Sequence, residues 1–262
     1  NSSAFHKFTN KQQLAAVEQT RRRLTVDSTD KYKNENKKIF FWNNRNARRK
    51  QSGTLIWWFK EWLDKVGHDK AMLLMHTDPR DQHGQDLPHI IEHLKVTDGQ
   101  VMISTNKVSP ADLAVLYNTA DYTINISDAE GFGLSTLESL SCGTPIIVNM
   151  TGGLQEQVTN GKEWFGFGIE PSSKSVIGSL QVPYIYEDRI NQQDFEKALT
   201  KALNWSNKAY DKMSRRGIRH VEDNYNFEDY EKRWVDFMDN VVEKYGSWPS
   251  TQYKTWHLLE VA

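Results

Sequence analysis

The sequence is short of cysteine, of net charge and of long apolar runs. Its one cysteine, Cys142, excludes an internal disulfide and is typical of a reducing compartment, so we expect a cytoplasmic protein. No apolar run approaches the roughly 20 residues that a membrane span needs, and the polar N-terminus has no signal-peptide pattern. With a formal net charge of -1, the chain has no general attraction for nucleic acid, which we do not expect as a partner.

Several enzyme motifs are missing as well. No Gly-x-Gly-x-x-Gly follows the first predicted strand, which argues against a dinucleotide dehydrogenase, and there is no Walker lysine motif. No Asp-x-Asp pair occurs, since Asp78 and Asp81 are three positions apart, and the histidines form no ligand pairs beside acids. We therefore predict no metal site. Cys142 lies late in a predicted helix among apolar neighbours and is interpreted as a core residue.

What the sequence does contain is an alternation of apolar runs and amphipathic segments between residues 38 and 149. Strands are predicted at 38–42, 70–77, 100–105, 122–127 and 145–149. Helices are predicted at 54–67, 86–96, 109–120 and 133–143. Continuously apolar strands that alternate with helices indicate a parallel sheet covered by helices on both faces. The predicted fold class is therefore α/β, with a Rossmann-like parallel sheet.

Outside this region the pattern changes. A helix is predicted at 10–24, and three more at 191–204, 207–223 and 227–244. The long segment before these helices is rich in Gly and Ser, and short strands are expected in it only near 167–169 and 183–186. Loops of such length inside a compact domain are usually functional.

The stretch EGFGLSTLE, residues 130–138, is the first candidate site. It follows a predicted strand and opens a helix, and ligands of doubly wound sheets bind at the carboxyl ends of strands. Glycines let the backbone approach a ligand closely, and free N–H groups at a helix N-terminus favour phosphate. Glu138, inside the helix, is placed to accept hydrogen bonds from a diol such as ribose. A structural turn followed by a surface glutamate explains the same residues, and spacing alone does not decide between the two.

The second candidate is the basic loop NNRNARRKQ after the first predicted strand. Arg45 and Lys50 are placed to meet a diphosphate there, the arginine through its planar fork and the lysine as a point charge. Arg48 and Arg49 add to the positive field. A solvated basic turn remains the alternative interpretation. A further glycine-containing stretch, TGGLQEQ at 151–157, follows the end of another strand and is a weak signal alone.

Together these residues resemble the donor-binding half of the family 4 retaining glycosyltransferases, which adopt the GT-B fold. The resemblance depends on Glu130-x7-Glu138 together with Arg45-x4-Lys50 upstream of it. The stretches LYNTADYTINIS and TGGLQEQV match the same plan. It covers residues 36–160 and extends to the closing helices at 191–244. It implies one half of a GT-B fold, the C-terminal domain, with a missing N-terminal domain that would bind the acceptor.

The resemblance also implies a division of the chain into four parts. Residues 1–37 would be an N-terminal helix and linker, and 38–190 a Rossmann-like nucleotide-sugar-binding domain. Residues 191–246 would be C-terminal helices that pack on this domain, and 247–262 an aromatic tail.

Site roles follow from the same resemblance. Three residues would be catalytic: Arg45 and Lys50 would bind the donor diphosphate and stabilise the charge of the leaving nucleotide, and Glu130 would hold sugar hydroxyls. The backbone N–H groups of three neighbours would assist Glu130: Gly131, Phe132 and Gly133. The remaining predicted donor contacts are Leu134 to phosphate, Glu138 to ribose, and Thr105 and Val108 to the base.

The function implied is transfer of a sugar, with retention, from a UDP- or GDP-linked donor. The departing diphosphate would take the acceptor's proton, so neither a protein base, a metal nor a cofactor is expected. Two alternatives stay open: a nucleotide-sugar binding module that is inactive without its acceptor domain, and a nucleotide-sugar 2-epimerase of the same fold. The sequence departs from the family pattern at Gln51-Ser52, where a glycine is usual, and at the long 160–186 insertion, which could be a lid or an acceptor contact.

Overall fold

The computed structural model describes residues 4–27 and 31–246. The predicted aromatic tail at 247–262 lies outside the described residues. The chain divides into two compact units, Asn1–Glu222 and Asp223–Ala262. The division falls near the end of one C-terminal helix.

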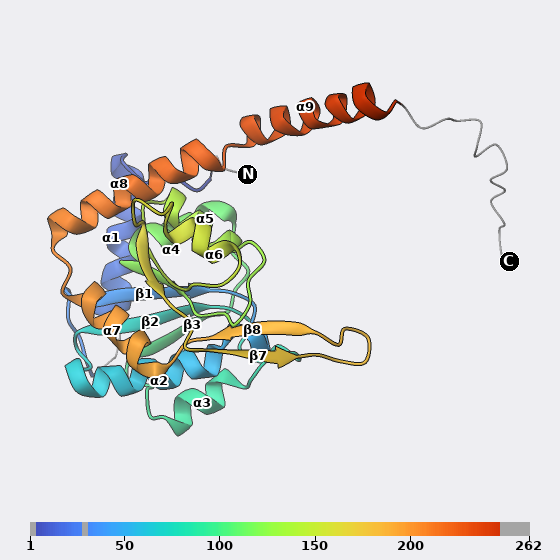
Figure 1. Ribbon diagram of the computed structural model, residues 1–262. Coiled ribbons are helices and arrows are strands. Elements are labelled where there is room, and N and C mark those ends of the chain that lie inside the picture. Colours follow the sequence, from blue (N-terminus) through green and yellow to red (C-terminus); the bar gives the residue numbers. More distant parts are fainter. Residues whose placement is uncertain (1–3, 28–30, 247–262) are drawn as a thin grey trace, which may run out of the picture. The chain divides into compact units, whose positions relative to one another are not determined.

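A six-stranded parallel sheet forms the centre of the first unit (Figure 1). Its strand order is β3-β2-β1-β4-β5-β6. Strands β2 and β3 are added outward on one side of β1, and β4, β5 and β6 on the other side, so the order of addition reverses between β1 and β4, which are parallel. The strands are β1 (Lys38–Asn43), β2 (Ala71–His76), β3 (Val101–Ser104), β4 (Tyr122–Asn125), β5 (Ile146–Asn149) and β6 (Gly166–Ile169). The predicted α/β class with a parallel Rossmann-like sheet is confirmed.

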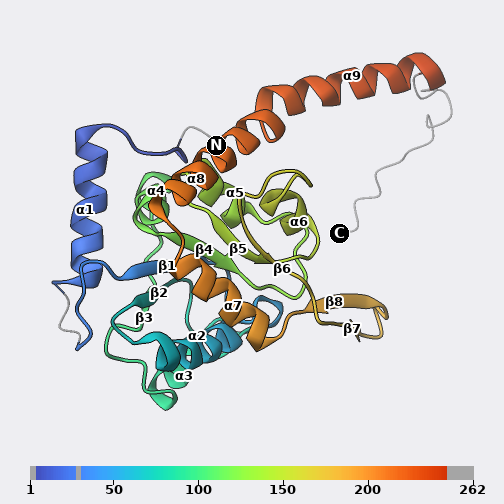
Figure 2. The same cartoon turned by 60° about the vertical axis from the view of Figure 1, so that its left-hand side comes forward.

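Helices cover both faces of the sheet because successive side chains of each strand point to opposite faces. On β1, Phe40 and Trp42 pack with the helices on one face, α2 (Ser52–Val66), α3 (Leu87–His93) and α7 (Gln192–Leu203). Ile39 and Phe41 pack on the other face with α4 (Pro110–Thr119). The same face farther along the sheet is covered by α5 (Leu134–Ser141), α6 (Gly153–Val158) and α8 (Asn207–Asn224). Figure 2 shows these two layers on either side of the sheet.

The N-terminal helix α1 (Lys11–Thr25) packs against this core. It begins at Asn10, whose side chain accepts a hydrogen bond from the Gln13 backbone N–H. Leu24 is buried in the cluster that contains Phe41, and Arg21 forms an ion pair of 3.0 Å with Asp121 at the start of β4. Burial and this pair attach α1 to the sheet.

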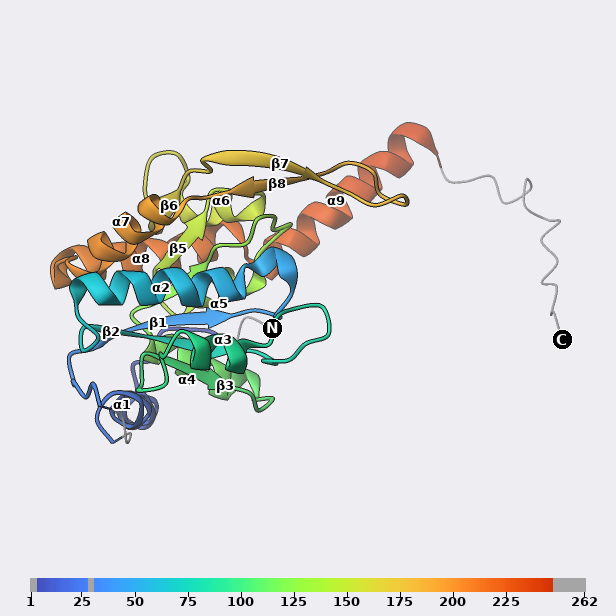
Figure 3. The same ribbon diagram turned by 90° about the horizontal axis from the view of Figure 1, so that it is seen from below.

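The segment after β5 is the region that the sequence predicted least well. A short helix, α6, follows β5, where only a glycine-containing loop was expected. The strand expected near 183–186 forms slightly later, as β8 (Ile185–Arg189). It pairs antiparallel with β7 (Ser173–Ile177), which was not predicted. In Figure 3 this β7–β8 hairpin extends beyond the carboxyl ends of the central strands.

The three predicted C-terminal helices all form. Phe195 of α7 and Met213 of α8 are buried, so these two helices complete the first unit. The third, α9 (Phe227–Tyr245), belongs to the second unit and contains no buried residue. Its exposed apolar side chains include Tyr230 and Trp234. Within residues 4–27 and 31–246, no helix combines the length and apolar character that a membrane crossing requires.

Candidate functional site

Most of the residues singled out from the sequence line one cavity of about 440 Å³. It lies where β1 and β4 end, at the point where the strand order reverses, which is the usual ligand position in doubly wound sheets. The predicted residues in its lining are Arg45, Lys50, Glu130, Phe132, Gly133, Leu134 and Glu138. Four other residues complete it: Asn43, Asn44, Leu113 and Ser135.

The basic loop after β1 is ordered by buried polar contacts and not merely solvated. Asn46, fully buried, donates a hydrogen bond of 2.7 Å to the carbonyl of Gln85 and accepts one of 2.7 Å from the Ser52 hydroxyl. The chain then makes a short 3-10 helix, η1 (Arg48–Lys50), which the sequence did not predict. Gln51 follows with φ 55°, in the left-handed region. Gln51 is the first residue of the Gln51-Ser52 pair, where the resemblance implied a glycine.

Within the cavity, Lys50 and Glu130 contact each other directly. The Lys50 Nζ donates a hydrogen bond to Glu130 Oε2, and the two side chains are only 8% and 11% exposed. Burial lowers the pKa of Lys50, partly offset by Glu130. Burial opposes ionisation of Glu130, but the hydrogen bond and charge of Lys50 outweigh it, so the pKa of Glu130 lies below its usual value. Arg49 is also near, 3.6 Å from the same carboxylate.

Arg45 lies at the open side of the cavity and is bound to an aspartate. Its guanidinium donates hydrogen bonds of 2.6 and 3.1 Å to the two oxygens of Asp81. These bonds hold the pKa of Asp81 well below its usual range. The arginine side chain is 59% exposed, so this is a surface pair that contributes little to stability. Arg45 is therefore oriented beside the cavity by Asp81, and its charge is paired with that carboxylate.

The turn that carries Glu130 is supported by the glycines of TGGLQEQ. The Gly153 N–H donates a hydrogen bond of 3.1 Å to the Glu130 carbonyl. Gly152 has φ 48°, and a Cβ there would lie 1.9 Å from the same carbonyl oxygen. Gln157, buried in α6, donates a hydrogen bond of 2.6 Å to the Phe132 carbonyl. The third sequence constellation thus shapes the site without lining it.

Glu138, on α5, is bound from the opposite wall. The hydroxyl of Tyr117 donates a hydrogen bond of 2.8 Å to Glu138 Oε2, and that hydroxyl accepts one of 2.8 Å from the Asn43 amide. Burial raises the pKa of Glu138, although the Tyr117 hydrogen bond reduces this effect. Sequence reasoning missed Tyr117 and Asn43 because no spacing relates them to residue 138. The only signal was the position of Tyr117 within LYNTADY.

Three predicted contacts are not among the lining residues of this cavity: Thr105, Val108 and Gly131. Thr105 and Val108 lie in the loop that joins β3 to α4, and Thr105 is exposed. The predicted base-binding role of this loop stays a prediction. Cys142 is buried, and burial raises the pKa of its thiol to about 12, which agrees with its interpretation as a core residue.

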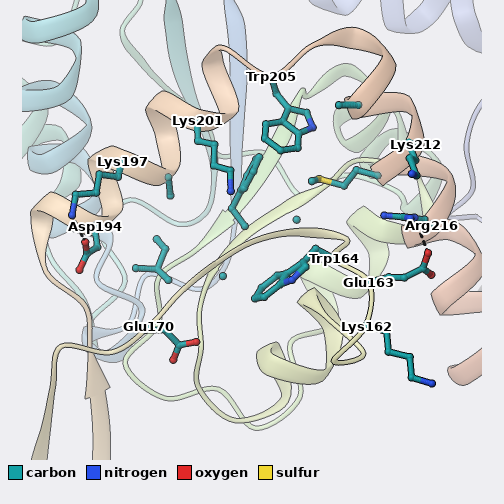
Figure 4. A pocket seen from close by; sticks show the side chains of 17 residues that line it. Lys162, Glu163, Trp164, Glu170, Asp194, Lys197, Lys201, Trp205, Lys212 and Arg216 are labelled. Carbon is teal, nitrogen blue, oxygen red and sulfur yellow. Dashed lines mark hydrogen bonds and ion pairs between the residues drawn. The ribbon is translucent and has the colours of Figure 1, made fainter.

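A larger cavity, of about 800 Å³, lies along the outer edge of β6 (Figure 4). Trp164, Phe167 and Trp205 line it, and the ammonium group of Lys201 lies 5.2 and 5.4 Å from the rings of Phe167 and Trp205. It contains none of the motif residues. Because the cations, carboxylates and helix N-terminus converge on the smaller cavity, that cavity is the candidate functional site.

The chain matches the family model for the group 1 glycosyl transferases over residues 26–220, and it belongs to this family. A probable sucrose-phosphate synthase from Thermosipho melanesiensis is 27% identical over 179 residues, which are 67% of this chain and 40% of that protein. A carrot (Daucus carota) sucrose synthase is 28% identical over 119 residues, 45% of this chain and 12% of that protein. The chain therefore spans less than half the length of these relatives.

Solved structures place the fold among the GT-B glycosyltransferases. A sucrose-phosphate synthase from Thermosynechococcus elongatus superposes with a TM-score of 0.65 and 19% identity, over 93% of this chain and 51% of that one. Anabaena HepE, solved with UDP and glucose, gives a TM-score of 0.66 and 14% identity, over 91% and 54%. A C-terminal domain of a group 1 glycosyl transferase from Francisella tularensis gives 0.59 and 17%, over 86% and 98%. The fold is thus that of the C-terminal domain of a GT-B enzyme.

Proposed function

We propose that this chain is the donor-binding domain of a retaining glycosyltransferase that takes its sugar from a UDP- or GDP-linked donor. The observation that carries the proposal is the single cavity that brings together Lys50, Glu130, the N-terminus of α5 and Glu138. These groups suit phosphate, sugar hydroxyls and ribose, the successive parts of a nucleotide sugar. A purely structural role gives no reason for Lys50, Glu130 and Glu138 to line the same cavity beside a helix N-terminus.

The diphosphate would lie between the basic loop and α5. Lys50 and Arg45 supply positive charge from one side, and the free N–H groups of Leu134 and Ser135 supply hydrogen-bond donors from the other. These groups would stabilise the negative charge that grows on the diphosphate as the bond to the sugar breaks. In this proposal the protein's own cations carry that task, and no metal or cofactor takes part.

The two glutamates would bind opposite ends of the donor. Glu130, beside Lys50, would accept hydrogen bonds from the sugar hydroxyls next to the phosphate. Tyr117 holds Glu138 through Oε2, so Oε1 is the oxygen proposed to accept hydrogen bonds from the ribose. The acceptor oxygen would bond to the anomeric carbon on the face from which the diphosphate departs, which gives retention, and the diphosphate would take the acceptor's proton, so that no protein base is needed.

The acceptor side is proposed to come from a second domain. The chain spans about half the length of the solved GT-B neighbours, 51% and 54% in the two cases above. HepE was solved with UDP and glucose, and this supports a nucleotide-sugar donor by analogy of fold. Alone, the 262 residues are expected to bind the donor without turning it over.

Calorimetry with UDP and GDP tests the proposal on the chain as it stands. We expect saturable binding of at least one of them, and a loss of at least about tenfold in affinity for the double variant Arg45→Ala/Lys50→Ala, which corresponds to about 1.4 kcal/mol. Lys65→Ala, late in α2, is the control, because Lys65 is an exposed lysine that pairs with Glu196 and does not line the cavity; it should leave the affinity unchanged. No binding of either nucleotide, or an unaffected double variant, would sink the proposal.

A further inference from the structure

Glu187 of β8 is a buried carboxylate that reaches back to the basic loop. Its side chain is 2% exposed and accepts hydrogen bonds from both ends of the Arg48 guanidinium, 3.1 Å from Nη1 to Oε2 and 2.5 Å from Nη2 to Oε1. Arg189 donates a third hydrogen bond of 3.2 Å to Oε2. The fork of Arg48 fits both carboxylate oxygens at once, so this pair fixes direction as well as distance.

The strand that carries Glu187 is itself attached to the sheet beside the donor site. The Asp188 N–H donates a hydrogen bond of 2.8 Å to the Asp128 carbonyl, and the Asp188 carbonyl accepts one of 2.7 Å from the Asn149 amide. Thr151 donates a further one of 2.8 Å to the Asp188 carboxylate. These contacts root the β7–β8 hairpin at the ends of β4 and β5, close to the turn that carries Glu130.

Arg48 opens η1, two residues before Lys50. The same short helix is held from the sheet side, because the Asp128 N–H donates a hydrogen bond of 2.8 Å to the Arg49 carbonyl. The Gln51 amide donates another of 2.5 Å to the Asp128 carboxylate. With Arg48 bound to Glu187, η1 is fixed at its start, its middle and its end.

We propose that Glu187 is a positioning residue of the donor site: by holding Arg48 it fixes η1, so that Lys50 faces the donor diphosphate. The inference rests on the proposed function. It also gives the 160–186 insertion a role other than lid or acceptor contact, because the root of the hairpin that the insertion builds supports the cationic loop. Arg48 then serves as an anchor and does not itself bind phosphate.

Glu187→Gln separates this role from a general effect on folding. The substitution keeps the shape of the side chain and removes the charge that holds Arg48. If Glu187 acts through Lys50, only ligands with a diphosphate lose affinity. We expect titrations followed by ligand-observed NMR to show UDP weakened by about fivefold or more, with uridine within about twofold of the unmodified chain.

Two further variants sharpen the test. Glu163→Gln is the matched control, because Glu163 also pairs with an arginine, Arg216 at 2.8 Å, but lines the larger cavity instead. It should leave both ligands unaffected. Arg48→Gln removes the other member of the same pair. The Arg48 side chain is 57% exposed, and Arg189 still pairs with the Glu187 carboxylate in this variant, so we expect it to fold even if Glu187→Gln does not. It should weaken UDP selectively as well.

The outcomes are distinct. Equal losses for UDP and uridine, or an unchanged affinity for UDP in both Glu187→Gln and Arg48→Gln, would overturn the positioning role. Failure of the unmodified chain to bind UDP or GDP would overturn the proposed function instead. A selective loss for UDP in Glu187→Gln, with Glu163→Gln unaffected, supports the inference. Where Glu187→Gln folds and binds UDP normally, a selective loss confined to Arg48→Gln would show that Arg48 binds phosphate itself and would also overturn it.

Discussion

Lys50 and Glu130, 80 positions apart in sequence, are joined by a direct hydrogen bond inside the candidate site. Their proposed roles concern different parts of the donor, the diphosphate for Lys50 and the sugar for Glu130. Because the two side chains are in contact, we expect the junction of sugar and phosphate to lie beside them. In a transferase, this is the bond that breaks, so the pair marks where we expect the reacting carbon to lie.

Removal of one member of this pair should destabilise the chain, and removal of both should not. Lys50→Met leaves a largely buried carboxylate whose remaining ion-pair partner, Arg49, is 3.6 Å away, so we expect the free energy of unfolding at pH 7 to fall by about 1–3 kcal/mol. The double variant Lys50→Met/Glu130→Gln should recover most of this stability in urea denaturation and still fail to bind UDP. A double variant that binds UDP normally would contradict the roles of both residues.

The same single variant gives a pH dependence. Lys50 holds the pKa of Glu130 below its usual value, so the stabilisation of this carboxylate is present above the pKa of the unfolded chain and is lost as pH falls through the folded pKa. In the variant, burial is no longer opposed by Lys50 and the pKa of Glu130 is higher than in the unmodified chain, so the difference in stability between the two should shrink steadily as pH falls through the range where Glu130 gains its proton. Urea denaturation from pH 7 to pH 3 measures it. A difference that is constant over this range would show that the pair's charge is not the cause.

Glu138 should make nucleoside binding sensitive to mild acid. Burial raises its pKa, so the carboxylate gains a proton at a higher pH than an ordinary glutamate and then loses acceptor capacity for the ribose. We expect the affinity for uridine, which has no phosphate, to fall as pH is lowered toward 5, and Glu138→Gln to remove this dependence. Glu138→Gln should also weaken nucleotides more than free sugar. Equal losses for the two ligands would argue against the ribose role.

Gln51 is predicted to replace the family's glycine through its side-chain contacts. Its left-handed backbone is unfavourable for a residue with Cβ, but its side chain donates to Asp128 and accepts a hydrogen bond of 2.7 Å from Thr54. Gln51→Gly should change the free energy of unfolding by less than about 1 kcal/mol, and Gln51→Ala should lower it by about 1 kcal/mol or more. Lys95, exposed and also left-handed, is the control: Lys95→Gly should raise stability. An alanine variant as stable as the glycine variant would refute this account.

Gly152 should be the glycine that the site tolerates losing least. A Cβ at this position meets the Glu130 carbonyl oxygen at 1.9 Å, and its φ of 48° is strained for other residues. Gly152→Ala should therefore cost about 2 kcal/mol or more of stability and weaken UDP binding. Gly131→Ala, with nothing within 4 Å of the added carbon, should unfold like the unmodified chain. Thermal denaturation compares the two, and similar melting temperatures would contradict the close approach.

The sheet was predictable because its strands are continuous apolar runs separated by helices with clear start signals, as at Ser109-Pro110. The β7–β8 hairpin was not, since its strands, SKSVI and IYEDR, are short and mostly exposed. In the site, the sequence motifs follow the ends of neighbouring predicted strands, so that Arg45, Lys50, Glu130 and Glu138 could be expected at one edge of the sheet. Long-range pairs such as Arg48–Glu187, 139 positions apart, have no spacing signal and become visible only when the chain is folded.

A structure of the chain determined with bound UDP tests the central claim most directly. The account predicts UDP in the cavity of about 440 Å³, with the diphosphate within hydrogen-bond distance of Lys50 Nζ and the N-terminus of α5, and the ribose at Glu138. UDP bound instead in the larger cavity beside Trp164 and Trp205, or a diphosphate remote from Lys50, would contradict it.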